Sequence, residues 1–123
     1  MTGEAMKSYA DLVDEARARV PEVTVADLLA FQRAGTPVVL VDVRDQSEVN
    51  LGWIPGAMHI SRGTLEGKIE QAVGRDAKIV LYCSSGNRSL LAGDVLRRMG
   101  YADVSSLAGG IRAWVEQGGD LDG

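Results

Sequence analysis

Two short apolar runs constrain the fold more than any other feature of this sequence. Val38–Val43 (VVLVDV) and Lys78–Cys83 (KIVLYC) are rich in branched apolar side chains, and each is too short to be a typical buried helix. Runs of this composition are typical of strands in a parallel sheet whose two faces are both covered. We therefore expect both runs to be strands of such a sheet.

Segments with helical spacing alternate with the strands. The predicted helices cover Tyr9–Arg19, a stretch from Thr24 to about Gly35, about Thr64–Val73, Ser89–Met99 and Ile111–Gln117. Shorter elements are predicted as a helical turn at Gln46–Leu51 and strands at Ala57–Ile60 and Val104–Leu107. This alternation predicts an α/β fold with right-handed crossovers, a mainly parallel central sheet and helices on both faces.

Length and composition indicate one soluble domain. The chain has 123 residues, of which 46% are hydrophobic and 24% are charged, and its net charge is −4. No apolar stretch approaches the length of a membrane span, and the charge offers no general attraction to nucleic acid or anionic lipid. We expect no membrane or nucleic-acid partner. The predicted organisation is a helical extension over 1–21, a core domain over 22–118 and a flexible tail over 119–123.

Cys83 is the only cysteine and His59 the only histidine. A single cysteine excludes an intramolecular disulfide, and together the two residues exclude the usual four-ligand zinc site, so we expect no metal. A lone thiol suits a reducing compartment, and the N-terminal residues do not resemble a secretory signal. The sequence therefore predicts a cytoplasmic protein.

The loop after the second strand carries the candidate chemistry. It consists of small polar residues that lead into the predicted helix: Cys83, Ser84, Ser85, Gly86, Asn87, Arg88 and Ser89. The carboxyl end of a strand is where open α/β sheets bind ligands, and a helix start offers free N–H groups to an anion. Such surroundings can lower the pKa of a cysteine to about 3.5 to 7.5 and make it nucleophilic. The alternative is an inert buried cysteine that ends a strand.

Three segments resemble motifs of the rhodanese family of sulfurtransferases. Val41–Ser61 is similar to the family's N-terminal signature, Tyr82–Ser89 to its active-site loop, and Leu107–Gly118 to its closing glycine and tryptophan pattern. The three segments follow the family's order, and together with the intervening elements they cover about residues 22 to 118, which implies a rhodanese-like fold. One departure is Trp53, because the family usually has histidine at this position.

The resemblance implies a double displacement at Cys83 that needs no organic cofactor. Cys83 would take the outer sulfur of a donor such as thiosulfate or a persulfide, and pass it to a thiol, cyanide or protein acceptor. The backbone amides of Ser84–Ser89 would hold the sulfur. Arg88 would either orient the anionic donor or brace the loop.

Other functions remain possible for the same loop. It could serve a sulfur carrier with little turnover, or a redox sensor, although the chain has no second cysteine to complete a switch. Related phosphatases and arsenate reductases place five residues between cysteine and arginine, whereas four residues separate Cys83 from Arg88 here. The shorter loop favours a sulfane sulfur over a tetrahedral phosphate.

The remaining polar and aromatic residues are interpreted as structural. We expect Asp42, Arg44 and Glu48 to form an ion-pair cluster that fixes the loop after the first strand. His59 matches a structural position of the family, Arg62 is expected on the surface, and Trp53 and Trp114 are expected to pack. The helix Tyr9–Arg19 could pack on the edge of the domain or mediate a homodimer.

Overall fold

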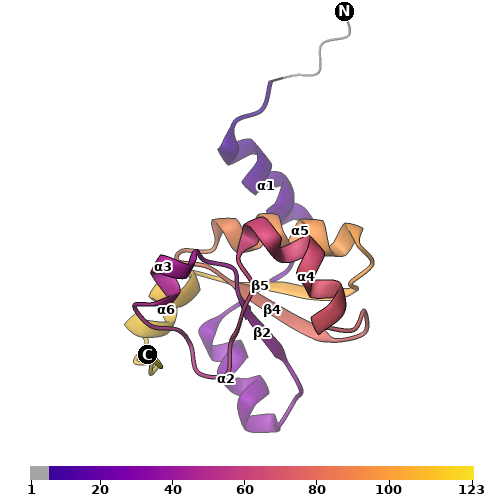
Figure 1. Cartoon of the computed structure of the whole chain (residues 1–123). Helices are drawn as coiled ribbons and strands as arrows, with labels where there is room; N and C mark the ends of the chain where they lie inside the picture. Colours follow the sequence, from indigo (N-terminus) through magenta and orange to yellow (C-terminus); the bar gives the residue numbers. More distant parts are fainter. Residues whose placement is uncertain (1–5) are drawn as a thin grey trace, which may run out of the picture.

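A computed structural model describes residues 6–123 and shows a five-stranded sheet in which every strand pair is parallel (Figure 1). The strand order is β1-β5-β4-β2-β3. The strands are β1 (Glu22–Val23), β2 (Val39–Asp42), β3 (Met58–His59), β4 (Lys78–Tyr82) and β5 (Asp103–Leu107). The predicted α/β fold with a parallel sheet is confirmed.

Helices cover both faces of this sheet. The helices within residues 6–123 are α1 (Tyr9–Arg19), α2 (Val25–Ala34), α3 (Gln46–Val49), the 3₁₀ turn η1 (Arg62–Thr64), α4 (Leu65–Ala72), α5 (Asn87–Arg98) and α6 (Gly110–Glu116). Side chains alternate across β4, so Leu81 packs in a core with α4 and α5, while Val80 and Tyr82 pack in a second core with α2 and α6. The buried strands thus account for the continuous apolar runs of the sequence.

Helix α1 lies outside these two cores and extends away from the body of the domain (Figure 1). It packs on α5 through Val13 and Ala16, which form a small third core with Val20 and Leu90. Tyr9 and Leu12 on the same helix are exposed. Every helix of residues 6–123 is too short or too polar to cross a bilayer.

Element boundaries differ from the predictions at two places that matter. The two-residue strand β1 was not predicted, because a pair of residues carries no alternation that a sequence pattern could reveal. Helix α5 begins at Asn87, two residues before the predicted start at Ser89. The reason is Gly86, which caps the helix with a left-handed φ of 113° and so brings Asn87 and Arg88 into the first turn.

The segment predicted as a tail lies against the domain. Asp122 and Trp53 exchange two backbone hydrogen bonds of 2.9 and 3.0 Å, and the Trp114 indole donates to the carbonyl oxygen of Asp120 at 2.7 Å. The side chain of Leu121 lies so close to Gly52 that a Cβ added there would be 3.3 Å from Leu121 Cδ1. Both tryptophans therefore help to place the last residues of the chain.

Candidate active site

Cys83 directly follows β4, the central strand, and lies in the core beneath the start of α5. Only 1% of the residue is exposed, and it belongs to the same apolar cluster as Leu81 and Val43. Its sulfur accepts a hydrogen bond of 3.1 Å from the backbone N–H of Gly86. The Sγ atom also lies 3.5 Å from the hydroxyl oxygen of Ser89. A backbone amide at a helix N-terminus therefore points at the sulfur.

The other loop residues take different positions. Ser84 is half-buried and its hydroxyl donates to Glu48 Oε1 at 3.0 Å, whereas Ser85 and Asn87 are exposed. Within residues 6–123, the amide of Gly86 is the one that hydrogen-bonds the sulfur in this structure. Holding of a substrate sulfur by the amides of Ser84–Ser89 stays a prediction.

The start of α6 is anchored on the Cys83 loop. The backbone N–H of Ile111 donates to the Cys83 carbonyl at 2.9 Å, and that of Arg112 donates to the Ser84 carbonyl at 3.2 Å. Gly110 makes this approach possible, because a Cβ at this position would overlap the carbonyl oxygens of Cys83 and Ser84. Its φ of 59° also suits glycine. Gly110 therefore allows α6 to dock on the loop that carries Cys83.

Arg88 braces this loop against α3. Its two terminal nitrogens donate to the two carboxylate oxygens of Glu48, each at 2.8 Å, and one of them also donates to Ser84 Oγ at 3.2 Å. The hydrogen bonds from Arg88 lower the pKa of Glu48 to about 2, and those same bonds raise the pKa of Arg88. The bracing alternative for Arg88 is therefore present in this structure.

A second ion pair fixes the loop after β2. The guanidinium of Arg44 forms hydrogen bonds of 2.7 to 3.1 Å with both carboxylate oxygens of Asp42, and donates to the Gly52 carbonyl at 2.7 Å. Burial opposes the charge of Arg44, but the bonds and charge of Asp42 outweigh it, and the pKa of Arg44 is raised. The expected Asp42–Arg44 pair is confirmed. Glu48 contributes its carbonyl to Arg44 at 3.4 Å, while its carboxylate pairs with Arg88.

His59 and Arg62 lie in structural contacts. The Nε2 atom of His59 is 2.8 Å from the carbonyl oxygen of Arg44, which requires this nitrogen to be the donor. Arg62 forms a partly exposed ion pair of 2.9 Å with Glu66 at the start of α4. Both contacts agree with the structural interpretation of these residues.

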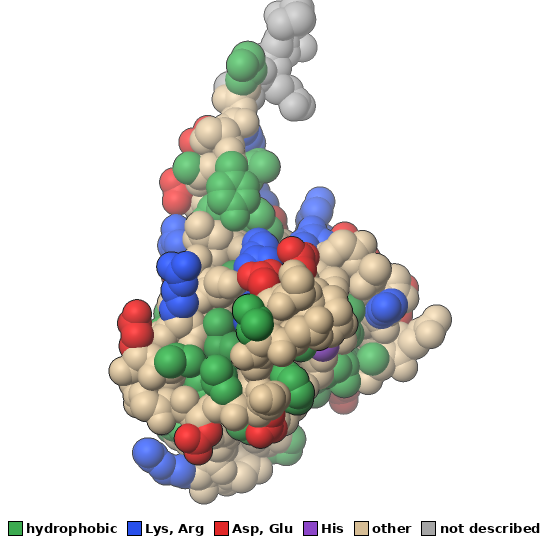
Figure 2. Space-filling view, turned by 60° about the vertical axis from the view of Figure 1, so that its left-hand side comes forward, with side chains coloured by type: hydrophobic (Ala, Val, Ile, Leu, Met, Phe, Trp, Pro, Cys, Tyr) green, Lys and Arg blue, Asp and Glu red, His purple; other side chains and the backbone are tan. Residues whose placement is uncertain are grey.

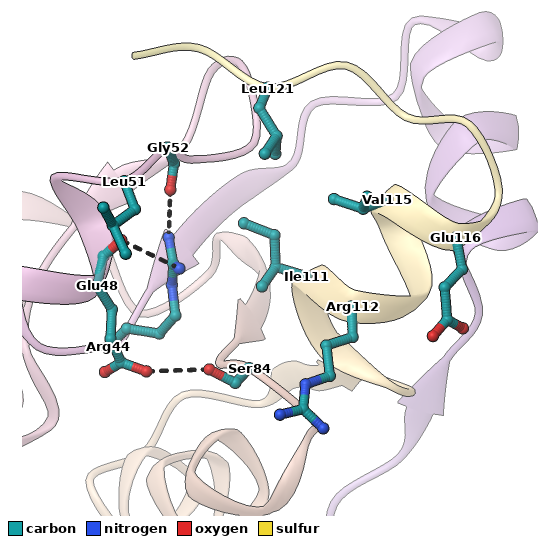
Figure 3. A pocket seen from close by; sticks show the side chains of 10 residues that line it. All are labelled: Arg44, Glu48, Leu51, Gly52, Ser84, Ile111, Arg112, Val115, Glu116 and Leu121. Atoms are coloured by element: carbon teal, nitrogen blue, oxygen red, sulfur yellow. Dashed lines mark hydrogen bonds between the residues drawn. The ribbon is translucent and has the colours of Figure 1, made fainter.

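A pocket of about 640 Å³ opens beside the loop at Ser84. Figure 3 shows Arg44, Glu48 and Ser84 on one side of it, and side chains of α6 and the C-terminal segment on the other. Its apolar wall includes Ile111, Val115 and Leu121, with Leu51 at the rim, 87% exposed. Figure 2 shows hydrophobic side chains gathered on the face that carries α3, α6 and the chain end. Cys83 is buried and does not line the pocket, whereas its neighbour Ser84 does.

Sequence reasoning missed Ser106 and the pocket residue Arg112. Ser106 is fully buried in β5, and its hydroxyl oxygen lies 2.7 Å from that of Ser89. A signal was available, since two serines interrupt the otherwise apolar run Val104–Leu107. Arg112 follows the glycine pair in the sequence, but its place beside Ser84 depends on how α6 docks.

Comparisons with known proteins agree with this architecture. A family model described as a rhodanese-like domain matches residues 24–117. A sulfurtransferase of Allochromatium vinosum is 37% identical over 81 residues, which are 66% of this chain and 75% of that protein.

Two solved structures resemble the whole fold. A protein of unknown function from Rhodopseudomonas palustris, described as a possible tyrosine phosphatase, has a TM-score of 0.86 at 34% identity, over 99% of each chain. The polysulfide-sulfur transferase homodimer from Wolinella succinogenes has a TM-score of 0.77 at 27% identity, over 89% of this chain and 83% of that one. With the three sequence motifs in place around one parallel sheet, the chain belongs to the rhodanese-like domain family.

Proposed function

We propose that this protein is a sulfurtransferase that carries a sulfane sulfur as a persulfide on Cys83. The observation that carries the proposal is the 3.1 Å hydrogen bond from the Gly86 amide, at the start of α5, to the Cys83 sulfur. A helix N-terminus and its amides stabilise negative charge, which the Cys83 sulfur bears as a thiolate before the first transfer and again after the second. The family and a relative described as a sulfurtransferase support the same reaction class.

The first half-reaction consumes the donor. The Cys83 thiolate attacks the outer sulfur of thiosulfate, so that a new S–S bond forms and the S–S bond of the donor breaks. Sulfite leaves with the electron pair of that bond, and the negative charge moves to the outer sulfur of the Cys83 persulfide. Charge and atoms balance without any metal or redox cofactor. A persulfide donor reacts in the same way and leaves as its thiolate.

The second half-reaction regenerates the enzyme. A cyanide, thiol or protein acceptor attacks the outer sulfur, the persulfide bond breaks, and its electron pair returns to Cys83 as the thiolate. The donor product leaves before the acceptor reacts, so the proposal requires ping-pong kinetics. This division into two displacements at one sulfur is nucleophilic catalysis.

The pocket at Ser84 is the proposed route for substrates to the loop. Arg88 is held by Glu48, whereas Arg112 lines the pocket and forms no ion pair within residues 6–123. We assign to Arg112 the role of attracting an anionic donor, which the sequence offered to Arg88. Because Cys83 is buried, the outer sulfur of the donor must enter between Ser84 and the helix start. A reducing, cytoplasmic setting suits this lone thiol.

The same geometry argues against a phosphatase or an arsenate reductase. A phosphatase needs its arginine free to bind a tetrahedral phosphate, but both ends of the Arg88 fork are engaged by Glu48. Four loop residues between Cys83 and Arg88 also make a smaller cradle. A sulfur carrier differs from an enzyme only in turnover, and the rate of thiocyanate formation from thiosulfate and cyanide separates them.

Incubation with thiosulfate followed by mass spectrometry of the intact protein tests the proposal. We expect the wild-type chain to gain the mass of one sulfur atom, and cyanide to remove it. Cys83→Ser removes the nucleophile but keeps the size of the side chain, so this variant should fold, stay unmodified and form no thiocyanate. Circular dichroism verifies its fold. Sulfur addition to Cys83→Ser, or none to the wild type, would overturn the mechanism.

A further inference from the structure

Two buried hydroxyls lie behind the Cys83 sulfur. Ser89 of α5 and Ser106 of β5 are both 0% exposed, and their oxygens are 2.7 Å apart. Ser89 Oγ is 3.5 Å from Cys83 Sγ and 3.0 Å from the carbonyl oxygen of Gly86. The three side chains and this carbonyl therefore form a chain of contacts inside the core.

The number of protons limits how this chain can be arranged. The Gly86 carbonyl only accepts, a thiolate only accepts, and the Ser89 hydroxyl has one proton to give. Within residues 6–123, Ser89 is the only hydrogen-bond partner of the Ser106 hydroxyl. If Ser89 donated to Ser106, neither the thiolate nor the carbonyl would receive that proton. Ser106 must therefore be the donor to Ser89 whenever Ser89 serves Gly86 or Cys83.

We propose that Ser106 is a positioning residue that holds Ser89 as a switchable donor to the Cys83 sulfur. With a neutral thiol, Ser89 donates to the Gly86 carbonyl; with a thiolate, the same hydroxyl turns to the sulfur. Ser106 donates to the Ser89 oxygen in both arrangements and strengthens the Ser89 donor through the chain. A buried thiolate then has two donors, the Gly86 amide and the Ser89 hydroxyl, in place of water.

The switch fits both stages of the proposed sulfur transfer, on which this role in catalysis rests. When the outer sulfur arrives, the negative charge moves from Sγ to that sulfur. The Ser89 hydroxyl then turns back and donates to the Gly86 carbonyl. When an acceptor removes the outer sulfur, the charge comes back to Sγ and Ser89 turns again. No proton has to leave the core in either step.

The charged groups around the loop stay in place in the test variants below. They are Arg88 on α5, Glu48 on α3, the Asp42–Arg44 pair after β2, and Arg112 on α6. Helix α4 contributes apolar residues to the core cluster of Cys83, and Asp103 at the opposite end of β5 pairs with Lys78. A change of the Ser106 hydroxyl thus alters the donors at the sulfur without altering any ionised side chain.

Titration of the thiolate by its ultraviolet absorbance tests the role directly, because Cys83 is the only cysteine. Loss of the donor in Ser106→Ala should move this pH profile upward by about half a unit to one unit. Below the midpoint, the rate of persulfide formation should then fall about threefold to tenfold. Ser105→Ala is the matched control, since Ser105 is the neighbouring serine on the other face of β5 and its hydroxyl forms no hydrogen bond within residues 6–123.

A second pair of variants separates the hydroxyl from the packing. Ser106→Thr and Ser106→Val have nearly the same shape and differ in the hydroxyl, so any strain from the added volume is common to both. Thr should keep the profile near that of the wild type, and Val should shift it as Ala does. Equal profiles for Thr and Val, or for Ser106→Ala and Ser105→Ala, would overturn the role of Ser106. The absorbance does not depend on sulfur transfer, so a wild type that forms no persulfide refutes the proposed function separately.

Discussion

The loops that follow β2 and β4 leave neighbouring parallel strands at the same edge of the sheet, but they are held by different forces. At the end of β2, two full charges, Asp42 and Arg44, are buried and satisfy each other. After β4, the buried Cys83 sulfur receives only neutral donors, an amide and a hydroxyl. The cation of that loop, Arg88, is turned away to Glu48.

The difference reflects two roles: the Asp42–Arg44 pair is a fixed support, whereas the Cys83 sulfur must change its charge. A carboxylate in a bidentate pair with arginine stays ionised, and it stays rigid because breaking the pair leaves a buried charge. A sulfur that alternates between thiolate and persulfide needs donors that adapt at little cost. The fold thus places a permanent ion pair next to the reactive atom but not in contact with it.

The largest expected effect is a loss of stability when the buried ion pair of Asp42 and Arg44 is broken. Arg44→Ala leaves Asp42, only 1% exposed, without its partner, and should lower the free energy of unfolding by about 3 to 5 kcal/mol. Urea denaturation measures this change. Arg17→Ala, which removes exposed pairs with Asp14 and Glu22, should cost less than about 1 kcal/mol. Similar losses in both variants would remove the contrast between buried and surface pairs.

The next largest effect should come from disturbing the docking of α6 on the loop after β4. Gly110→Ala introduces a Cβ that overlaps the Cys83 and Ser84 carbonyls at a left-handed φ, and should cost about 1 to 3 kcal/mol. Sulfur transfer should fall at least tenfold, because the loop must move by a fraction of an ångström or more.

Gly67→Ala is the matched control for that substitution. Gly67 is exposed inside α4, a Cβ there meets open space, and the change should raise stability by about 0.5 to 1 kcal/mol. Thermal unfolding and thiocyanate formation are measured for both variants. Unaltered transfer in Gly110→Ala would show that docking of α6 does not position Cys83.

The smallest expected effect concerns the ion pair between Glu48 and Arg88, and it depends on pH. Arg88 lowers the pKa of Glu48 from 4.5 to about 2, so the folded state favours the ionised carboxylate. Its contribution is complete above about pH 4.5 and is lost as the pH falls toward 2. Glu48→Gln should therefore be less stable than the wild type by about 1 kcal/mol at neutral pH.

Urea denaturation of both proteins along a pH series checks this window. The two stabilities should converge as the pH falls through about 2, because the wild-type carboxyl then takes up its proton and becomes neutral as well. A difference that stays constant down to this pH would assign the effect to shape instead of charge.

Local signals in the sequence were enough to predict most elements and the position of the reactive loop. Val39–Asp42 and Lys78–Tyr82 are apolar runs, and the helix predicted from Thr24 begins there, where Thr24 and Asp27 form both hydrogen bonds of a capping box. Cys83 and Gly86 meet because they are three residues apart at a helix start. Contacts of this kind are encoded in spacing.

Contacts between distant segments were not predictable in the same way. The sequence left two roles for Arg88, and the choice depended on Glu48, 40 residues away. Ser106 meets Ser89 only because β5 pairs with β4 beneath α5. The burial of Cys83 likewise follows from the packing of α5 on the sheet, which no property of the loop residues specifies.

The contact between Asp122 and Trp53 has a practical consequence for anyone who handles this protein. Leu121 forms part of the pocket wall and Gly123 lies against Gly52, which also lines the pocket, so an affinity tag or fusion partner appended after Gly123 would start close to the pocket mouth. Appended residues there would compete with substrates for space and could displace Leu121 from the pocket wall. Attachment ahead of α1, which points away from the body of the domain, keeps the mouth clear.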